Sequence, residues 1–285
     1  MPLIWDLSKI QVMGILNCTP DSFSDGGLYL SLETALSHVD QMVKAGANII
    51  DVGGESTRPG ADPVDLDTEL ARVIPVIQAI HQKYPNLPIS IDTTKAEVAR
   101  QAVLNGAKII NDIHGFKDPQ IFDFAVEAHQ SHGVALVVMH MRGRSVKTMQ
   151  TENLEHDHLF EEIKDWLKGQ VQALEMAGVD PKSIAIDPGI GFGKTVDQNI
   201  EILSRCAELK SLGVAVLIGT SRKSFIGQIC NRQKDQRLYG SLATECLVAW
   251  EGAHILRVHD VEPTIDAMKI IEQCLKFKAK SNRLF

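Results

Sequence analysis

One phrase recurs along the chain: a segment of helical pattern ends at a glycine, a short apolar run follows, and the run ends in a polar residue. It occurs as KAGANIIDVGG, LNGAKIINDIHG, SHGVALVVMHM, MAGVDPKSIAIDPG, SLGVAVLIGTSRK and WEGAHILRVHD. The glycines are Gly46, Gly106, Gly133, Gly178, Gly213 and Gly252. Each stands where a helix would end, because only glycine adopts the left-handed conformation of that position without steric cost. The apolar runs lack clear alternation, as expected of parallel strands buried on both faces.

Two further apolar runs, Ile10–Leu16 and Pro88–Ile91, bring the number of expected strands to eight. The expected helices between and after them are Leu32–Lys44, Leu66–Lys83, Lys95–Leu104, Gln120–Gln130, Asp157–Met176, Asp197–Leu209, Tyr239–Trp250 and Pro263–Lys276. Eight strands, each followed by a helix, predict an α/β fold of the (β/α)8 TIM-barrel type. A doubly wound sheet is the alternative, but it usually has fewer strands and needs a switch point. No linker-like segment interrupts the pattern, so we expect a single domain over residues 1–285.

Charge and composition limit the classes of partner. The 285 residues carry a net charge of -7, which provides no basic field for nucleic acid. No apolar run reaches the roughly 18 residues needed to cross a bilayer, and the start of the chain has no long apolar stretch typical of a signal peptide. Five widely spaced cysteines without a C-x-x-C pair are typical of reduced thiols. We therefore expect a cytoplasmic protein with neither nucleic acid nor membrane as a partner.

Polar residues mark the carboxyl ends of the expected strands. In a barrel these ends meet at one mouth, where side chains act on ligands. Any one of them could be a turn residue that caps a helix, but several carboxylates near a barrel core are costly unless something pairs with them. We therefore predict a ligand site. The residues are Asn17, Asp51, Asp92, Asn111, His140, Asp187, Ser221–Lys223 and Arg257–His259.

Two kinds of ligand chemistry are indicated at this mouth. Carboxylate and amide side chains suit a flat heterocycle with amide-like edges. Arg257, His259 and Arg58 suit a phosphate or pyrophosphate, because arginine offers a planar fork of donors and histidine a further one. The segments Asn17–Leu28 and Gly53–Val64, rich in glycine, proline and hydroxyl groups, follow the first two strands. They could be passive surface loops, but we expect them to overhang the mouth and to order on ligand binding.

Seven segments in order resemble the dihydropteroate synthases, in their bacterial single-domain form. The segments are MGILNCTPDSFSDGG, IIDVGGESTRPGA, ISIDT, IINDI, IAIDPGIGFGK, GTSRKSFIG and ILRVHDV. Each is weak alone, but together they span about residues 10–261 and are highly specific. The resemblance implies a TIM barrel that joins 6-hydroxymethyl-7,8-dihydropterin pyrophosphate to para-aminobenzoate. The products would be pyrophosphate and 7,8-dihydropteroate, a precursor of folate.

The resemblance also implies roles for individual residues. The pterin-binding positions are Asp51, Asp92, Asn111, Met139, Asp187 and Lys223. The pyrophosphate positions are Asn17, Thr57, Arg58, Arg257 and His259. The para-aminobenzoate positions, which sulfonamides also occupy in the family, are Pro20, Phe23, Phe192 and Ser224. The expected catalytic residues are Asp92, Lys223, Arg257 and His259, and Asn17 is the expected protein ligand of Mg²⁺. The family further implies a homodimer.

The mechanism implied by the resemblance begins with loss of pyrophosphate, whose charge Mg²⁺, Arg257 and His259 would neutralise. Asp92 would stabilise the remaining pterin cation, which the amine of para-aminobenzoate then attacks. Two alternatives remain. A pterin-binding methyltransferase would keep the Asp and Asn set but lack the TPDSFSDGG loop and the SRK and RVH clusters. A silent binding module would have lost Asn17, Lys223 or His259, and all three are present.

The stretch IAIDPGIGFGK, followed by threonine, ends like a phosphate-binding loop. Pro188 stands where the first glycine of that motif belongs, and the resemblance places the phosphate ligands elsewhere. We interpret the match as accidental. Asp187 is expected to hold the pterin, the glycines to shape a turn that presents Phe192, and Lys194 to be a solvated residue at a helix start.

Overall fold

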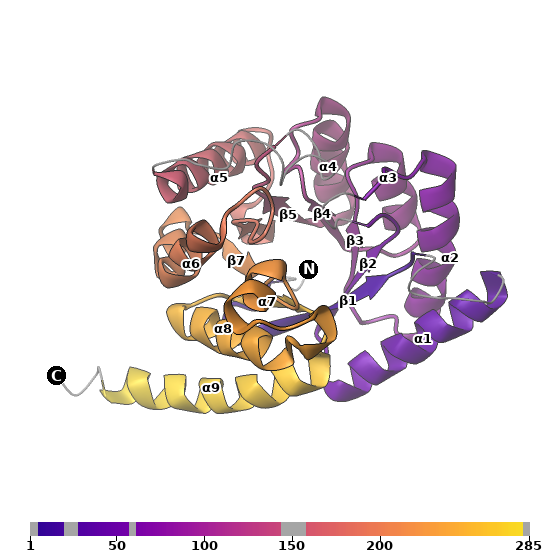
Figure 1. Ribbon diagram of the computed structural model, residues 1–285. Helices are drawn as coiled ribbons and strands as arrows, with labels where there is room; N and C mark the ends of the chain where they lie inside the picture. The colour runs from indigo at the N-terminus through magenta and orange to yellow at the C-terminus, as the bar shows by residue number, and fades with distance from the viewer. Residues whose placement is uncertain (1–4, 20–27, 57–60, 144–157, 282–285) are drawn as a thin grey trace.

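Eight parallel strands pair in chain order and close into a barrel (Figure 1). The computed structural model describes residues 5–19, 28–56, 61–143 and 158–281. Pairing of β1 with β8, in which Met13 lies opposite Arg257, closes the ring. The predicted (β/α)8 fold is therefore confirmed. The strands are β1 (Gln11–Asn17), β2 (Ile49–Gly53), β3 (Ile89–Asp92), β4 (Ile109–Asp112), β5 (Ala135–Met139), β6 (Ile184–Asp187), β7 (Ala215–Ile218) and β8 (Ile255–Val258).

Helices surround the barrel on the outside (Figure 1). They are α1 (Leu28–Ala45), α2 (Leu66–Lys83), α3 (Ala96–Leu104), α4 (Pro119–His132), α5 (Leu159–Met176), α6 (Val196–Ser204), α7 (Ser224–Cys230), α8 (Leu238–Glu251) and α9 (Val261–Ser281), with the short 3-10 helices η2 (Pro181–Ser183), η3 (Cys206–Leu212) and η4 (Lys234–Gln236). The single helix expected over Asp197–Leu209 is divided between α6 and η3, and α7 was not predicted. Among the described helices, none is both long and apolar enough to span a bilayer.

The glycines that were predicted to end helices all have positive φ angles, between 67° at Gly133 and 114° at Gly106. Gly133 ends α4, and its N–H donates to the carbonyl of His129 at 2.8 Å. A Cβ atom at Gly106 would lie 2.5 Å from Cγ of His81, so space as well as conformation requires glycine there. These short turns return the chain from each helix to the next strand.

The apolar core has two parts. The larger lies between the sheet and the helices and includes Val39, Ile77 and Phe160. The smaller fills the barrel at the amino ends of the strands, where Trp5 packs in one cluster with alanines of β5, β6 and β7. These alanines, Ala135, Ala185 and Ala215, leave volume inside the ring that the buried indole of Trp5 fills. The apolar layer closes this end of the barrel, and polar residues lie at the other end.

Candidate active site

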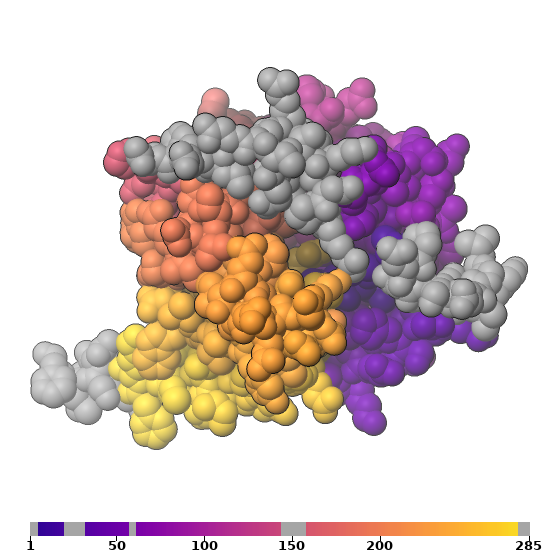
Figure 2. All heavy atoms as spheres, viewed as in Figure 1, coloured from indigo at the N-terminus to yellow at the C-terminus, as the bar shows by residue number. Residues whose placement is uncertain are grey.

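Strand register carries the predicted polar residues to one mouth of the barrel. Asp92 at the end of β3 lies opposite Asn111 of β4, and Met139 at the end of β5 lies opposite Asp187 of β6. These four side chains are buried. Seen from the side on which α7 lies, the molecule is hollowed near its centre beside this helix (Figure 2). Residues far apart in the sequence thus meet because parallel strands all end at the same rim.

Arg257 links two buried carboxylates inside this mouth. Its Nε donates to Oδ2 of Asp51 at 2.7 Å, and its Nη2 donates to Oδ2 of Asp92 at 2.6 Å. Asp51 is fully buried, and its Oδ1 has no hydrogen-bond partner among the described residues. Burial raises the pKa of Asp92 to about 7, while Arg257 opposes this shift. The structure therefore brings together residues that the resemblance divides between the pterin and pyrophosphate sites.

Lys223 holds its ammonium over the ring of Phe192, and its charge interacts with that of Asp187. Its ammonium donates to the carbonyl of Ile190 and stands 4.5 Å from the centroid of the Phe192 ring, a favourable cation–π distance. Burial lowers the pKa of Lys223 to about 8, and the charge of Asp187 opposes this shift. Burial likewise raises the pKa of Asp187, which Lys223 and the backbone N–H of Gly189 oppose. The ring of Phe192 belongs to an apolar cluster that includes Met139.

His259 stands just beyond the end of β8 with its ring against Ser221. Both its backbone N–H and its Nδ1 lie 3.1 Å from Oγ of Ser221. Burial lowers the pKa of His259 to about 3, and the positive charge of Arg257 adds to this effect. The ring is therefore neutral near pH 7 and can donate one N–H to an anion.

Arg222, although it lies in the predicted basic cluster, is engaged elsewhere. It adopts a left-handed conformation with φ of 57°. Its guanidinium pairs with Asp260, and its backbone N–H donates to Oγ of Ser241 at 2.9 Å. Arg222 therefore fastens the start of α7 to α8 and to the segment after β8.

The remaining predicted site residues differ in what the structure says of them. Asn17 ends β1 and is half-buried, and Ser224 is exposed as the first residue of α7. The other four lie outside the described residues: Pro20, Phe23, Thr57 and Arg58.

Lys194 corrects one prediction. The residue was expected to be solvated, but it is only 3% exposed. Its ammonium donates to the carbonyls of Gly189 and Phe192, at 2.8 Å and 3.0 Å. The flexible four-carbon stem lets the ammonium fold back onto converging backbone carbonyls, which satisfy the buried charge.

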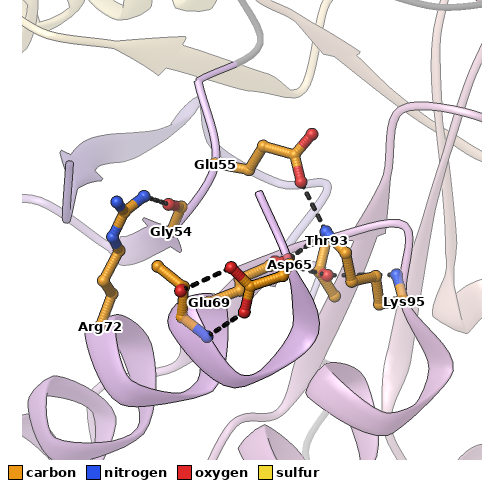
Figure 3. Close-up of polar contacts among 8 residues, drawn as sticks. Gly54, Glu55, Asp65, Glu69, Arg72, Thr93 and Lys95 are labelled. Atoms are coloured by element: carbon orange, nitrogen blue, oxygen red, sulfur yellow. Dashed lines mark hydrogen bonds and ion pairs between the residues drawn. The ribbon is translucent and has the colours of Figure 1, made fainter. Parts of the chain in front are cut away.

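An ionic network beside the mouth was not predicted (Figure 3). Glu69 on α2 is 1% exposed and accepts hydrogen bonds from Thr93 Oγ1 at 2.7 Å and from Lys95 Nζ at 2.5 Å. Lys95 also donates to Glu55, which follows β2, at 2.5 Å. Because Thr93 directly follows Asp92, this network fixes the chain where β3 enters the mouth. The signal in the sequence was a glutamate on the helix face that also carries Val73.

Metal ligands at the mouth are few. Among the described residues there is no group of three or more His, Cys, Asp and Glu side chains that could hold a metal ion. Asn17 offers one amide oxygen at the end of β1. Mg²⁺ commonly binds one or two protein oxygens together with waters and substrate phosphates, so a single amide oxygen fits an ion held mainly by a pyrophosphate.

Comparison with known proteins agrees with this geometry. The model of the family described as pterin binding enzyme matches residues 13–259. The chain is 47% identical over 280 residues to dihydropteroate synthase of Escherichia coli K12, covering 98% of this chain and 96% of that protein. It is 48% identical over 266 residues to the Synechocystis enzyme, covering 93% of this chain and 90% of that one.

Solved structures give the same result. The Yersinia pestis dihydropteroate synthase, in complex with a sulfonamide drug, superposes with a TM-score of 0.88 at 42% identity, covering 95% of this chain and 96% of that one. The Xanthomonas albilineans dihydropteroate synthase with 4-aminobenzoic acid gives 0.87 at 42% identity, covering 94% of each chain. The barrel, the polar mouth and these similarities together show that the chain belongs to the pterin-binding enzymes, and among them to the dihydropteroate synthases.

Proposed function

We propose that this chain condenses 6-hydroxymethyl-7,8-dihydropterin pyrophosphate with para-aminobenzoate, forming 7,8-dihydropteroate and pyrophosphate. One observation carries the proposal: buried carboxylate and amide groups lie beside a cation and an aromatic ring at the mouth of a barrel whose relatives are dihydropteroate synthases. We further propose that residues 1–285 act as one domain.

The pterin would lie deepest, among Asp51, Asp92, Asn111, Met139, Asp187 and Lys223. Carboxylates accept the ring and amino N–H groups of such a heterocycle, and an amide both donates and accepts. The buried mouth strengthens these hydrogen bonds, because little water competes for them. Met139 would contact the flat face of the ring.

The pyrophosphate would bind nearer the rim, to Arg257, His259, Asn17, Thr57 and Arg58. The neutral ring of His259 can donate one N–H, while Arg257 supplies charge and a planar fork. Arg257 already bridges Asp51 and Asp92, so an incoming anion competes with two carboxylates for the same guanidinium.

Magnesium is the proposed cofactor, held by Asn17 and by oxygens of the substrate. When bound it would neutralise charge on the leaving pyrophosphate. Arg257 and His259 would share that task from the protein side.

The reaction needs no nucleophile from the protein. The bond between the methylene carbon and the pyrophosphate oxygen breaks, and its electron pair leaves with pyrophosphate. Asp92 would stabilise the resulting cation, which is conjugated with the pterin ring. The amine nitrogen of para-aminobenzoate then bonds to the methylene carbon and loses one proton to solvent. Lys223 would hold the pterin in place and complement the negative charge nearby.

The para-aminobenzoate ring would contact Phe192 and Ser224, together with Pro20 and Phe23. The described part of this surface is supported by the burial of Phe192 and by its position beside Lys223. The carboxylate of this ring would bind Ser224 at the exposed start of α7.

The test is a coupled assay with both substrates, with and without Mg²⁺. We expect dihydropteroate to form only when both substrates are present, and to form much faster with the metal ion. Tight binding of the pterin substrate in calorimetry without any product would contradict the proposal and favour a silent binding module.

We also propose a cytoplasmic homodimer. All five cysteines are free, which suits a reducing compartment. The packed helices α8 and α9 expose Tyr239, Leu247 and Ile270, which suits a surface that a second copy covers. Light scattering should give about twice the mass of one 31.4 kDa chain.

A further inference from the structure

Lys194 lies outside the proposed substrate contacts, yet it is one of the most enclosed charged groups of the mouth. Its ammonium is directed at the carbonyls of Gly189 and Phe192, and it lies 3.4 Å from the carbonyl and 3.3 Å from Nδ1 of His140. An ammonium has three N–H groups, so these partners can satisfy all of them. The charge is thus held by backbone groups of the turn that follows β6.

That turn has a shape that requires such a donor. Gly189, Gly191 and Gly193 adopt left-handed conformations, with φ of 70°, 78° and 65°. A Cβ atom at Gly189 would lie 1.9 Å from the carbonyl oxygen of His140, so the turn is pressed against the end of β5. Carbonyls that converge in so tight a space repel one another unless a donor lies between them.

The outer side of the same turn is held by α6. The N–H of Gly191 donates to Oδ1 of Asn199 at 2.6 Å, and Nδ2 of Asn199 donates to the carbonyl of Thr195 at 2.7 Å. Lys194 on one side and Asn199 on the other therefore both form hydrogen bonds with the turn of residues 189–192.

This segment carries three features of the mouth. Its first N–H, that of Gly189, donates to Oδ1 of Asp187 at 2.7 Å. The carbonyl of Ile190 accepts from Lys223, and the ring of Phe192 lies below the same ammonium. A Cβ atom at Gly191 would lie 3.0 Å from Cδ of Lys223, so the Lys223 side chain rests on the turn.

We propose that Lys194 is a positioning residue: its ammonium fixes the turn of residues 189–192, and through the turn it places the ring of Phe192 and the side chain of Lys223. The expected effect of Lys194 on catalysis rests on the proposed function, whereas its effect on the conformation of residues 189–192 does not. Burial lowers the pKa of Lys194 to about 7, because removing the ammonium from water costs free energy. The hydrogen bonds to backbone carbonyls offset part of this cost.

The first experiment needs no activity. Hydrogen exchange of the peptide that spans residues 187–195 is compared in the wild type, Lys194→Met and Lys182→Met. Lys182 is an exposed lysine just before β6, at the opposite end of the same strand, and is a matched control. We expect at least ~10-fold faster exchange of this peptide in Lys194→Met only, a factor equivalent to about 1.4 kcal/mol. Unchanged exchange would overturn the proposal.

The second experiment concerns catalysis. In Lys194→Met we expect the KM for para-aminobenzoate to rise at least ~10-fold through displacement of Phe192, and kcat/KM for the pterin substrate to fall through displacement of Lys223, whereas Lys182→Met should change neither. Wild-type kinetic constants in Lys194→Met would reject the positioning role. Lys194→Gln, which retains donors, should recover part of the loss, and it replaces Lys194→Met if that variant does not fold. If the wild type forms no dihydropteroate, the proposed function fails while the exchange result still stands.

Discussion

At the scale of single residues, the mouth is a set of buried charges that define one another. Lys223 keeps its ammonium beside Asp187, and Arg257 keeps its guanidinium between Asp51 and Asp92. Removing one partner of such a pair leaves the other charge buried without compensation, which costs more than the pair contributes. The pKa values of Asp92 and Lys223 therefore depend on the charges beside them as well as on burial.

Lys223 gives a prediction about pH. Because burial lowers its pKa to about 8, the ammonium loses its proton as the pH rises through about 8. The positive charge that interacts with Asp187 and Asp92 then disappears. We expect kcat/KM for the pterin substrate to fall above that pH.

Lys223→Ala is the matching variant. Its turnover should be severely reduced at every pH, and the alkaline decrease that belongs to Lys223 should be absent. Wild-type turnover in Lys223→Ala would remove this residue from the site.

The sequence predicts residues of this kind well where backbone geometry decides their position. Asp92, Asn111 and Asp187 were predicted because the carboxyl ends of parallel strands meet at one rim, so polar residues there lie on neighbouring strands. Lys194 was not, because a lysine after a glycine-rich turn is usually solvated. Its burial depends on carbonyls that converge only after the turn has folded.

At the scale of elements, the contact between α8 and α9 contains a carboxyl group that the proposed chemistry does not use. Glu245 on α8 is 2% exposed, and its Oε2 lies 2.9 Å from Oγ1 of Thr264 on α9. The same hydroxyl lies 2.8 Å from the carbonyl of Asp260. One hydroxyl proton cannot serve both oxygens, so a protonated Glu245 that donates to Thr264 completes the chain of hydrogen bonds.

Glu245→Gln tests this arrangement. Burial raises the pKa of Glu245 from 4.5 to about 7, so the folded state retains a proton that the unfolded state has lost. Wild-type stability from this group is therefore complete below pH 4.5 and decreases as the pH rises to about 7. The glutamine variant keeps a donor and does not titrate.

We expect Glu245→Gln to have nearly the same free energy of unfolding as the wild type at pH 4.5, and to be more stable at pH 8 by up to about 3 kcal/mol. Urea titrations at the two pH values provide the comparison. A constant difference between the two proteins would show that Glu245 does not titrate in this window.

Elements differ in how far the sequence predicts them. Helix α2 begins and ends at the predicted residues, because Asp65 caps it and a long amphipathic run follows. Helix α7 was missed, because it is short and contains Gly227, which weakens a helical pattern. The ionic contact of Glu69 with Lys95 was also missed, since charged helix residues normally face water, and only the packed fold shows that this one does not.

At the scale of the whole molecule, the barrel separates stability from chemistry. Trp5 and the apolar cluster around it fill the end at which the strands begin, whereas the charged groups lie where the strands end. Substitutions at the end with Trp5 should lower the free energy of unfolding, whereas substitutions at the mouth should change substrate binding and turnover.

Trp5→Ala should therefore lower the free energy of unfolding by about 3–5 kcal/mol while the KM values remain close to wild type at a temperature where the variant is folded. Trp5→Phe is the control: Nε1 of Trp5 has no hydrogen-bond partner among the described residues, so losing this group should cost far less. Raised KM values in folded Trp5→Ala would show that the two ends of the barrel are coupled.

Because apolar side chains close the barrel where its strands begin, substrates can enter and products can leave only through the mouth. Asp51 and Asp92 lie deep in the mouth, whereas Ser224 is exposed at its rim. On the proposed roles, the pterin must enter before para-aminobenzoate, because an occupant of the rim would obstruct the passage to the floor. The joined product spans both levels and must leave through the same opening. A ligand bound at the rim would then slow the dissociation of a pterin bound beneath it.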